Sequence, residues 1–390
     1  MTVADERVGG GIFAGGVSDD PDLARATGEV VGHALERVGF APDLAVLFVT
    51  APVIDQLDDV LLTVGSILGP RTLMGSTAVS VIGGPREVEQ RAAVSLWAAR
   101  WREGTVIESF VAECRPEPDG VVVTGGPRDD PLRGSTVLLL ADPFTFAVDS
   151  FLDHLAVHSP GVPVLGGLAS AAGGAGGNRL VLGDTVRTSG AVGVVLPSTV
   201  PVTTVVSQGC RPFGVPLTVT RSEGNRVDEL AGQPALGRLM EQVDALSPAD
   251  RELASRGLHV GRVIDEHKLD FERGDFLIRD VLGADHEQGA VVIGDVAPIG
   301  STLQFQVHDA ESATEDLHDL LGGRRAQGAL VFTCNGRGTR LFGEPNHDAV
   351  AVHDLLDGPS VGGMFCTGEI GPVGSSNFVH GFAASMALFE

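Results

Sequence analysis

Apolar residues near the start of the chain form short runs that alternate with a stretch of helical periodicity. Residues 44–50 are predicted to form a buried strand, because 44–49 are an unbroken apolar run. The helix predicted after this strand is ended by a Gly-Pro pair at 69–70. Two further apolar stretches follow at 72–84 and 92–99. The pattern predicts a strand–helix–strand–strand unit. The apolar face of its helix carries Leu57, Val60, Leu61, Val64 and Leu68.

The same succession recurs twice further along the chain. In the second copy, the first strand, the helix break and the two later strands lie at 135–144, 160–161, 162–174 and 190–197. In the third copy, they lie at 328–338, 358–359, 360–372 and 377–389. The repetition predicts three related units, with a long insertion before the third.

The insertion has a different pattern. Strands are predicted at 202–210 and 215–220, a helix from Pro234, and a hairpin of 290–296 and 301–307 around Ala-Pro-Ile-Gly. Together with the three units, this predicts an α/β protein of mixed α+β type, with mixed and antiparallel sheets flanked by helices.

Charge and cysteine content narrow the function classes. The chain has 51 acidic and 27 basic residues, a formal charge of −24, which repels nucleic-acid phosphates and anionic membranes. No basic leader precedes an apolar segment at the N-terminus, and the apolar runs are far shorter than the roughly 20 residues of a membrane span. The four cysteines form no Cys-x-x-Cys pair. We expect a reduced, cytoplasmic protein that binds no metal.

Motifs in the third unit indicate a family. Cys334-Asn335-Gly336-Arg337-Gly338, then residues 368–372 and His380-Gly381-Phe382, resemble the C-terminal half of FIST (F-box and intracellular signal transduction) domains. Residues 219–236 and 303–317 resemble earlier parts of that half, and 26–210 resemble the N-terminal half. The resemblance implies a stand-alone bacterial protein with a two-lobed architecture. We therefore expect a flexible N-terminal segment, a FIST N domain and a FIST C domain at 1–19, 20–210 and 211–390.

The resemblance also implies a function, namely a sensory module that binds an amino acid or similar small metabolite for signal transduction. It implies no established catalytic activity. Some members are haem-containing nitric-oxide sensors, so haem is an alternative cofactor where none is otherwise expected. The chain departs from the family at Ser80-Val81-Ile82, where the N-terminal half usually reads Gly-Glu-Ile. A ligand glutamate is then left only at Glu369, in the C-terminal half.

Arg337 and Glu369 are the leading ligand-binding candidates. A guanidinium in a glycine loop can hold a carboxylate by two hydrogen bonds, and a carboxylate can accept from an ammonium group, so the pair suits a zwitterion. Asn335, Gly338 and His380 complete the predicted ligand-binding set. The alternatives are that Arg337 pairs with a structural carboxylate, that Glu369 ties a turn together, and that His380 is a core histidine.

Other functions are compatible with the same residues. Cys334 or Cys366 would be the nucleophile of an enzyme if His380 or His353 acted as base, but both cysteines also suit buried strand ends. His380 is the candidate axial ligand of a haem-based gas sensor. A protein-interaction scaffold is a further alternative. We expect a small-molecule ligand and a signalling partner, and a homo-oligomer is compatible with the sequence.

Overall fold

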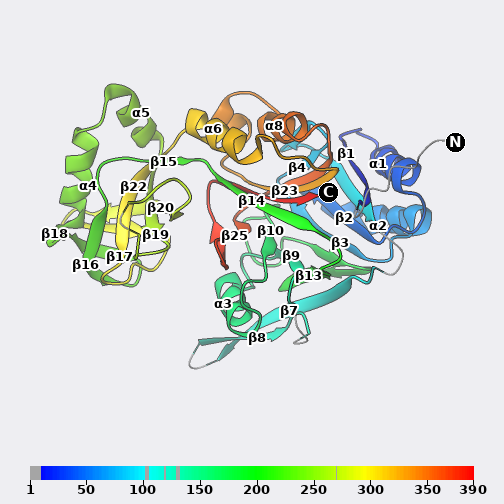
Figure 1. The fold of residues 1–390 in the computed structure, drawn as a ribbon, viewed down its shortest axis with the longest axis horizontal. Helices are drawn as coiled ribbons and strands as arrows, with labels where there is room; N and C mark the ends of the chain where they lie inside the picture. The colour runs from blue at the N-terminus through cyan, green and yellow to red at the C-terminus, as the bar shows by residue number, and fades with distance from the viewer. Residues whose placement is uncertain (1–9, 102–104, 118–119, 129–131, 269) are drawn as a thin grey trace. The chain divides into compact units, whose positions relative to one another are not determined.

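The computed structural model divides the chain into two compact units that are not its two sequence halves (Figure 1). The first unit runs to Val206 and also includes His318–Val379 and Ala384–Glu390. The second unit consists of Ser207–Leu317 and His380–Ala383. The third sequence repeat therefore folds with the first two, and the insertion forms most of the second unit. The structure describes residues 10–101, 105–117, 120–128, 132–268 and 270–390.

The first repeat forms a sheet in which a parallel pair of strands is flanked by an antiparallel one. Strand β2 (Leu44–Thr50) lies parallel to β3 (Leu73–Ala78) and antiparallel to β6 (Val94–Arg100). The connection from β2 to β3 consists of η1 (Ala51–Gln56), α2 (Leu57–Thr63) and η2 (Val64–Leu68). The sheet is completed by β1 (Ile12–Ser18) on one edge and by β11 (Leu180–Leu182) and β12 (Thr185–Arg187) on the other.

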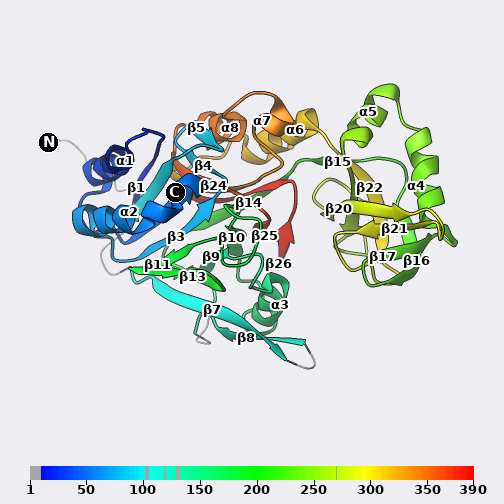
Figure 2. The same ribbon diagram turned by 180° about the vertical axis from the view of Figure 1, so that it is seen from behind.

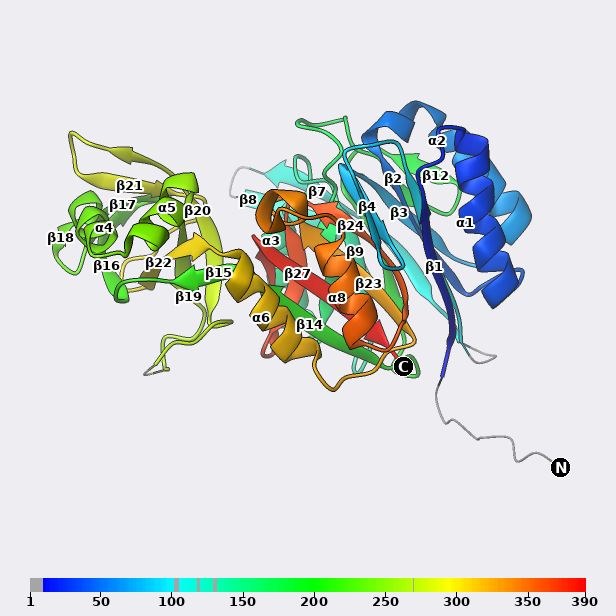
Figure 3. The same ribbon diagram turned by 90° about the horizontal axis from the view of Figure 1, so that it is seen from above.

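The N-terminal segment predicted to be flexible is partly a strand. Residues 12–18 pair with β6 from Ile12 to Ser18, because their alternating small and apolar side chains suit a sheet edge. Residues 1–9 lie outside the described residues. Helix α1 (Leu23–Val38) begins after Asp22, whose carboxylate accepts from the backbone N–H groups of Ala24 and Arg25. Helices α1 and α2 bury their apolar faces against this sheet (Figure 3).

The second and third repeats have the same strand arrangement. In the second, β9 lies parallel to β10 and antiparallel to β13, and α3 connects the parallel pair. In the third, β23 lies parallel to β24 and antiparallel to β27, and α7 and α8 connect the parallel pair. The second set is β9 (Thr136–Ala141), α3 (Val148–His158), β10 (Val164–Leu168) and β13 (Ala191–Leu196). The third set is β23 (Gly328–Cys334), α7 (Thr339–Phe342), α8 (His347–Leu355), β24 (Ser360–Cys366) and β27 (Ala383–Phe389). The three related units predicted from the sequence are therefore confirmed.

Each repeat also contributes one strand to the sheet of another repeat. Strand β4 (Ser80–Gly83), which follows β3, pairs with β24 of the third repeat. Strand β25 (Glu369–Val373), which follows β24, pairs with β10 of the second repeat (Figure 2). Strand β11, which follows β10, pairs with β3 of the first repeat. All three pairings are antiparallel, so the repeats exchange strands in a cycle. The outer strands of the second and third sheets are β5 (Arg86–Glu89), β7 (Glu108–Glu117), β8 (Gly120–Gly125), β14 (Val202–Gln208) and β26 (Ser376–His380).

The segments that pass from one sheet to another are hydrogen-bonded to one another. Ser170 Oγ accepts from Val79 N at 3.0 Å and donates to the Phe365 carbonyl at 2.6 Å. Thr367 Oγ1 donates to the Ala169 carbonyl at 3.3 Å. The three sheets share one core behind these crossings, where the rings of Trp97 and Phe389 lie 5.0 Å apart. Burial of this apolar surface is the main stabilising contribution to the first unit.

The second unit is a closed sheet with two helices. Strand β22 pairs with β16 and also with β19, so the order β22-β16-β17-β21-β20-β19 returns to β22. Its strands are β15 (Cys210–Pro212), β16 (Leu217–Glu223), β17 (Arg226–Leu230), β18 (Gln233–Pro234), β19 (Leu258–Val263), β20 (Phe276–Asp285), β21 (Ala290–Ile293) and β22 (Thr302–His308). Its helices are α4 (Ala235–Asp244) and α5 (Pro248–Arg256), and α6 (Ala310–Leu321) follows β22.

Two local predictions are wrong. The hairpin of 290–296 and 301–307 does not form, because β21 pairs with β17 and β20 and the connecting loop bonds instead to β16 and the β16–β17 turn, at Val219 and Gly224. The single strand predicted at 377–389 is divided into β26 and β27 by Gly381 and Phe382. Among the described residues, no helix is long and apolar enough to cross a membrane.

Candidate functional site

The glycine loop after β23 holds Arg337 inside the protein. The Arg337 side chain is fully buried, and its Nε and Nη2 donate to the Asp348 carboxylate at 2.7 and 2.8 Å. Gly338 has φ +63°, and a Cβ there would lie within 3.0 Å of Phe365 and of the Glu89 carboxylate. This position therefore requires glycine. The structure thus realises one of the alternatives left open by the sequence, since Arg337 pairs with a structural carboxylate.

Asp348 is the centre of this network. It is fully buried in the first turn of α8 and also accepts from Thr333 Oγ1 at 2.7 Å, while His347 Nδ1 lies 3.1 Å from its Oδ1. Burial alone would raise the pKa of Asp348, but the charge and hydrogen bonds of Arg337 hold the pKa well below its usual range. The pKa of Arg337 is raised against the opposing effect of burial by the Asp348 charge. The pair is therefore fully ionised at neutral pH.

Two glutamates of β5 hold the starts of the adjoining helices. Glu87 Oε1 accepts from Ala349 N of α8 at 3.0 Å, and Glu89 Oε1 accepts from the N–H and hydroxyl of Thr339 of α7 at 3.0 and 2.6 Å. Burial, followed by the negative charge of Asp348, raises the pKa of Glu87 to about 8. Glu87 is thus largely protonated at neutral pH.

The structure brings Arg337 and Glu369 together. Glu369 begins β25 and is fully buried, and its charge acts on Arg337. Cys334 and Cys366 are register partners on the parallel strands β23 and β24. Burial, with a contribution from the Glu369 charge, raises the pKa of the Cys366 thiol well above its ordinary value. A neutral, buried thiol of this kind is a poor nucleophile.

The remaining predicted residues lie in different surroundings. Asn335 N donates to the Cys366 carbonyl at 2.9 Å, which holds the loop against β24. His380 is 2% exposed and belongs to the second unit, whereas Asn335, Arg337, Gly338 and Glu369 belong to the first. His380 lines neither of two pockets described below, the arginine pocket and the α2 pocket of the first unit, and haem ligation by His380 stays a prediction. Within the described residues, no group of three His, Cys, Asp or Glu side chains is arranged to hold a metal ion.

Two contributors to the cluster were missed by sequence reasoning. Asp348 lies in the first turn of the helix predicted after Arg337. Its closeness in sequence to Arg337 was the signal from which this ion pair could have been predicted. Glu87 lies in another repeat and is brought in only by the pairing of β4 with β24. We call Arg337, Asp348, Glu369 and Glu87 the Arg337 cluster. Because the first three are each 0% exposed, no ligand reaches this cluster unless the glycine loop opens.

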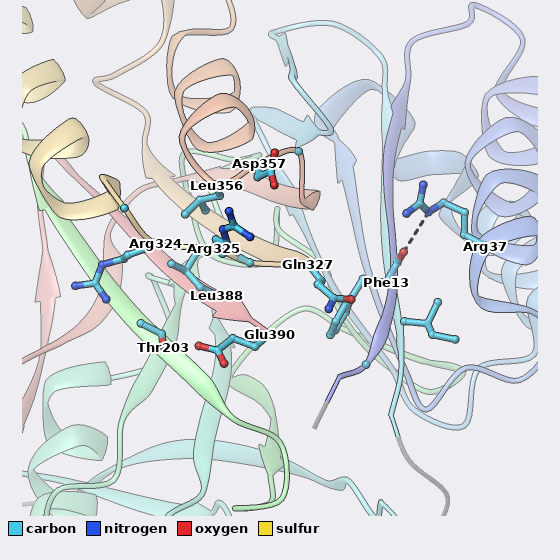
Figure 4. Close-up of a pocket in the computed structure, with 15 residues that line it drawn as sticks. Phe13, Arg37, Thr203, Arg324, Arg325, Gln327, Leu356, Asp357, Leu388 and Glu390 are labelled. Carbon is cyan, nitrogen blue, oxygen red and sulfur yellow. Dashed lines mark hydrogen bonds between the residues drawn. The ribbon is translucent and has the colours of Figure 1, made fainter. Parts of the chain in front are cut away.

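A second candidate site is an open pocket, the arginine pocket, in the first unit (Figure 4). Its volume is about 780 Å³, which is the size of a metabolite site. Six parts of the chain line it, namely β1, α1, β14, the segment between α6 and β23, the turn after α8, and the end of β27. Its polar and charged side chains are those of Arg37, Thr203, Arg324, Arg325, Gln327, Asp357 and Glu390.

Two arginines of this pocket donate to backbone carbonyls. Arg37 Nε donates to the Phe13 carbonyl at 3.3 Å and Arg324 Nε to the Leu320 carbonyl at 2.6 Å. Among the residues that the structure describes, neither these two nor Arg325 has a carboxylate within ion-pair distance. In the view of Figure 4, Arg325 lies between Arg324 and Arg37. The pocket therefore presents three guanidinium groups together with the carboxylates of Asp357 and Glu390.

Another pocket of the first unit is similar in volume but different in chemistry. This α2 pocket measures about 770 Å³ and is lined by residues of α2, η2, the start of β3 and the β11–β12 turn, with leucines among them. Its one arginine, Arg71, is already paired with Asp43 at 2.9 Å. The arginine pocket is therefore the better candidate for a charged ligand.

Comparison with known proteins agrees with the fold. The FIST N domain family matches residues 43–233, and the FIST C domain family matches 235–372. The uncharacterized protein MT0656 of Mycobacterium tuberculosis is 44% identical over 381 residues, covering 96% of this chain and 98% of its own length. The uncharacterized protein Mb0898c of Mycobacterium bovis is 43% identical over 381 residues, covering 96% and 97%.

The two matched domains do not coincide with the two compact units. The FIST N match ends and the FIST C match begins inside the second unit, so each domain contributes to both units. The boundary falls there because residues 233–235 lie within the insertion that forms most of the second unit. With both family matches spanning most of its length, the chain belongs to the FIST family.

Proposed function

We propose that this FIST protein binds a small anionic or zwitterionic metabolite in the arginine pocket and acts as a sensory component of signal transduction. FIST domains are associated with signal transduction and with proposed small-ligand sensing. The observation that carries the proposal is the set of three arginines around one open pocket without ion-pair partners among the described residues. Such guanidinium groups bind carboxylates through charge-assisted hydrogen bonds.

The lining of the pocket suits an amino-acid-like ligand. Arg324 and Arg325 supply donors for a carboxylate, and Thr203 and Gln327 supply neutral hydrogen-bonding groups. The carboxylates of Asp357 and Glu390 provide acceptors for an ammonium group. These are the two kinds of complementarity that a zwitterion requires.

The Arg337 cluster supports this proposal less well. A ligand carboxylate would have to replace Asp348 in a fully buried ion pair, and breaking such a pair costs about 3–5 kcal/mol. Ligand contact by Asn335, Arg337, Gly338, Glu369 and His380 stays a prediction that requires the loop to open. We propose that the cluster instead fixes the loop and the two helices that follow β23.

Ligand-dependent stabilisation tests the proposal. The purified chain is titrated with L-glutamate, succinate and inorganic phosphate in thermal-shift and calorimetric assays. A ligand at one hundred times its Kd stabilises the native state by about 2.7 kcal/mol. We expect at least one of these anions to stabilise the protein.

Charge-neutralised variants test whether the anion binds in the arginine pocket. The double variant Arg324→Gln/Arg325→Gln removes two cations from the pocket and should abolish the stabilisation. Arg133→Gln is the matched control, because Arg133 is exposed in the same unit and does not line the pocket. Equal stabilisation of the double variant and the control, or no stabilisation by any anion, would contradict the proposal.

A further inference from the structure

We infer that occupancy of the arginine pocket is transmitted to the second unit through β14, α6 and β27. The inference rests on the proposed function and concerns the regulation of the same site. It follows from where these elements begin and end, and from the hydrogen bonds at each end.

The chain passes between the units within regular elements. The passage after Val206 falls inside β14, and the passage after Leu317 falls inside α6. The passages before His380 and after Ala383 flank the turn between β26 and β27. Helix α6 is held by its internal hydrogen bonds, and β14 by its pairing with β27, so each is stiffer than a flexible linker and displacing one end displaces the other.

On the first-unit side, these elements contribute to the pocket wall. Thr203 belongs to β14, and Leu388 and Glu390 belong to the end of β27 or follow it. Arg324 follows α6 after two glycines and donates through Nε to the carbonyl of Leu320, in the last turn of α6. An anion that draws the Arg324 guanidinium toward itself therefore acts directly on the end of α6.

On the second-unit side, the same elements are bonded to one another. The Asp316 carboxylate of α6 accepts from Ser207 Oγ at 2.8 Å and from Gln208 N at 2.7 Å, both of β14. Gly209 N donates to the Phe382 carbonyl at 2.9 Å, and Asp309 N donates to the Gly209 carbonyl at 3.1 Å. The end of β14, the start of α6 and the β26–β27 turn are thus joined.

Phe382 fixes the turn in place. Its φ of +59° is unfavourable for a residue with a side chain, so the conformation must be held by packing. Its ring centroid lies 4.1 Å from that of His259 and 4.9 Å from that of His308, both on strands of the closed sheet. A displacement of β27 is therefore felt by the strands that carry these histidines.

Hydrogen–deuterium exchange with mass spectrometry tests the inference. The full chain is measured with and without succinate, L-glutamate or inorganic phosphate, each at a concentration that saturates the calorimetric signal. We expect slower exchange in the pocket wall and also in residues 207–209, 310–317 and 380–383. Asp316→Asn should keep the native affinity for the anion but lose the protection from exchange at 207–209. Ser207→Ala should keep this affinity and show weaker protection at 207–209. Asp319→Asn, an exposed change on the same helix, is the matched control.

The outcomes separate the two claims. Anion binding with unchanged exchange in the second unit overturns the transmission and leaves the proposed function standing. Full protection in both Asp316→Asn and Ser207→Ala also overturns it. Failure of every anion to bind overturns the proposed function and this inference together. Protection that spreads to the second unit in the native chain and in Asp319→Asn, and is lost in Asp316→Asn, supports the inference.

Discussion

The buried carboxyl of Glu87 makes the stability of the protein pH-dependent. Its pKa is raised to about 8 in the folded protein from an ordinary value of 4.5, because of burial and the adjacent Asp348 charge. A group with a raised folded pKa contributes stability that is fully present below pH 4.5 and is lost as the pH rises through 8. At about 1.4 kcal/mol per unit, the loss approaches about 5 kcal/mol above pH 8.

Glu87→Gln isolates this contribution. The amide keeps an oxygen that accepts from Ala349 N but does not ionise. Free energies of unfolding from urea titrations at pH 5, 7 and 9 should show the variant gaining stability relative to the native chain as the pH rises. The relative gain between pH 5 and pH 9 should be about 4 kcal/mol. The gain arises because the native chain then carries a buried, deprotonated Glu87 beside Asp348.

The control is Glu36→Gln, an exposed substitution on α1. Its stability should follow that of the native chain at each pH. Parallel curves for Glu87→Gln and the native chain would refute the reasoning, because they would mean that Glu87 has the same pKa in the folded and unfolded states. A variant that loses stability as the pH rises would refute it as well.

Three further predictions follow from the same region. Asp348→Asn should destabilise the protein by about 3–5 kcal/mol in urea titrations, because it leaves Arg337 buried without a counter-charge; equal stability would contradict this. Gly338→Ala should destabilise it by at least about 1 kcal/mol in the same assay, because its φ is +63° and its Cβ would crowd Phe365; a neutral effect would mean that the loop relaxes freely. Native iodoacetamide labelling should modify partly exposed Cys114 and spare buried Cys366, and rapid labelling of Cys366 would show that the cluster opens.

The repeats were predictable from the sequence because their signals are local. Strand-length apolar runs and the helical spacing of residues such as Leu57 and Val60 depend on neighbours within a few positions. The exchange of β4, β11 and β25 was not predictable, because the same alternating pattern allows a strand to pair with any open sheet edge. The mispredicted hairpin around residues 294–301 fails for the same reason, since both of its strands have other partners in the closed sheet.

In the candidate sites, too, local features could be predicted from the sequence and contacts between distant residues could not. The glycine loop around Arg337 was visible as a motif, and the resemblance to the FIST family was correct. Its buried partner Glu87 comes from a different repeat, about 250 residues earlier, so no local spacing indicates it. The arginine pocket gathers Arg37 and Arg324 from opposite ends of the chain, where each looks like an ordinary surface residue.

The exchange of strands also constrains how the chain can be made. Strand β4 lies near residue 80, but its partner β24 is not synthesised until residues 360–366 leave the ribosome. A nascent chain therefore carries β4 paired only with β5 and open along its other edge through most of translation, and exposed strand edges promote aggregation. Truncation before β24 should leave every shorter product without a completed first unit. This chain thus requires nearly the whole of its FIST C domain before its FIST N domain can finish folding.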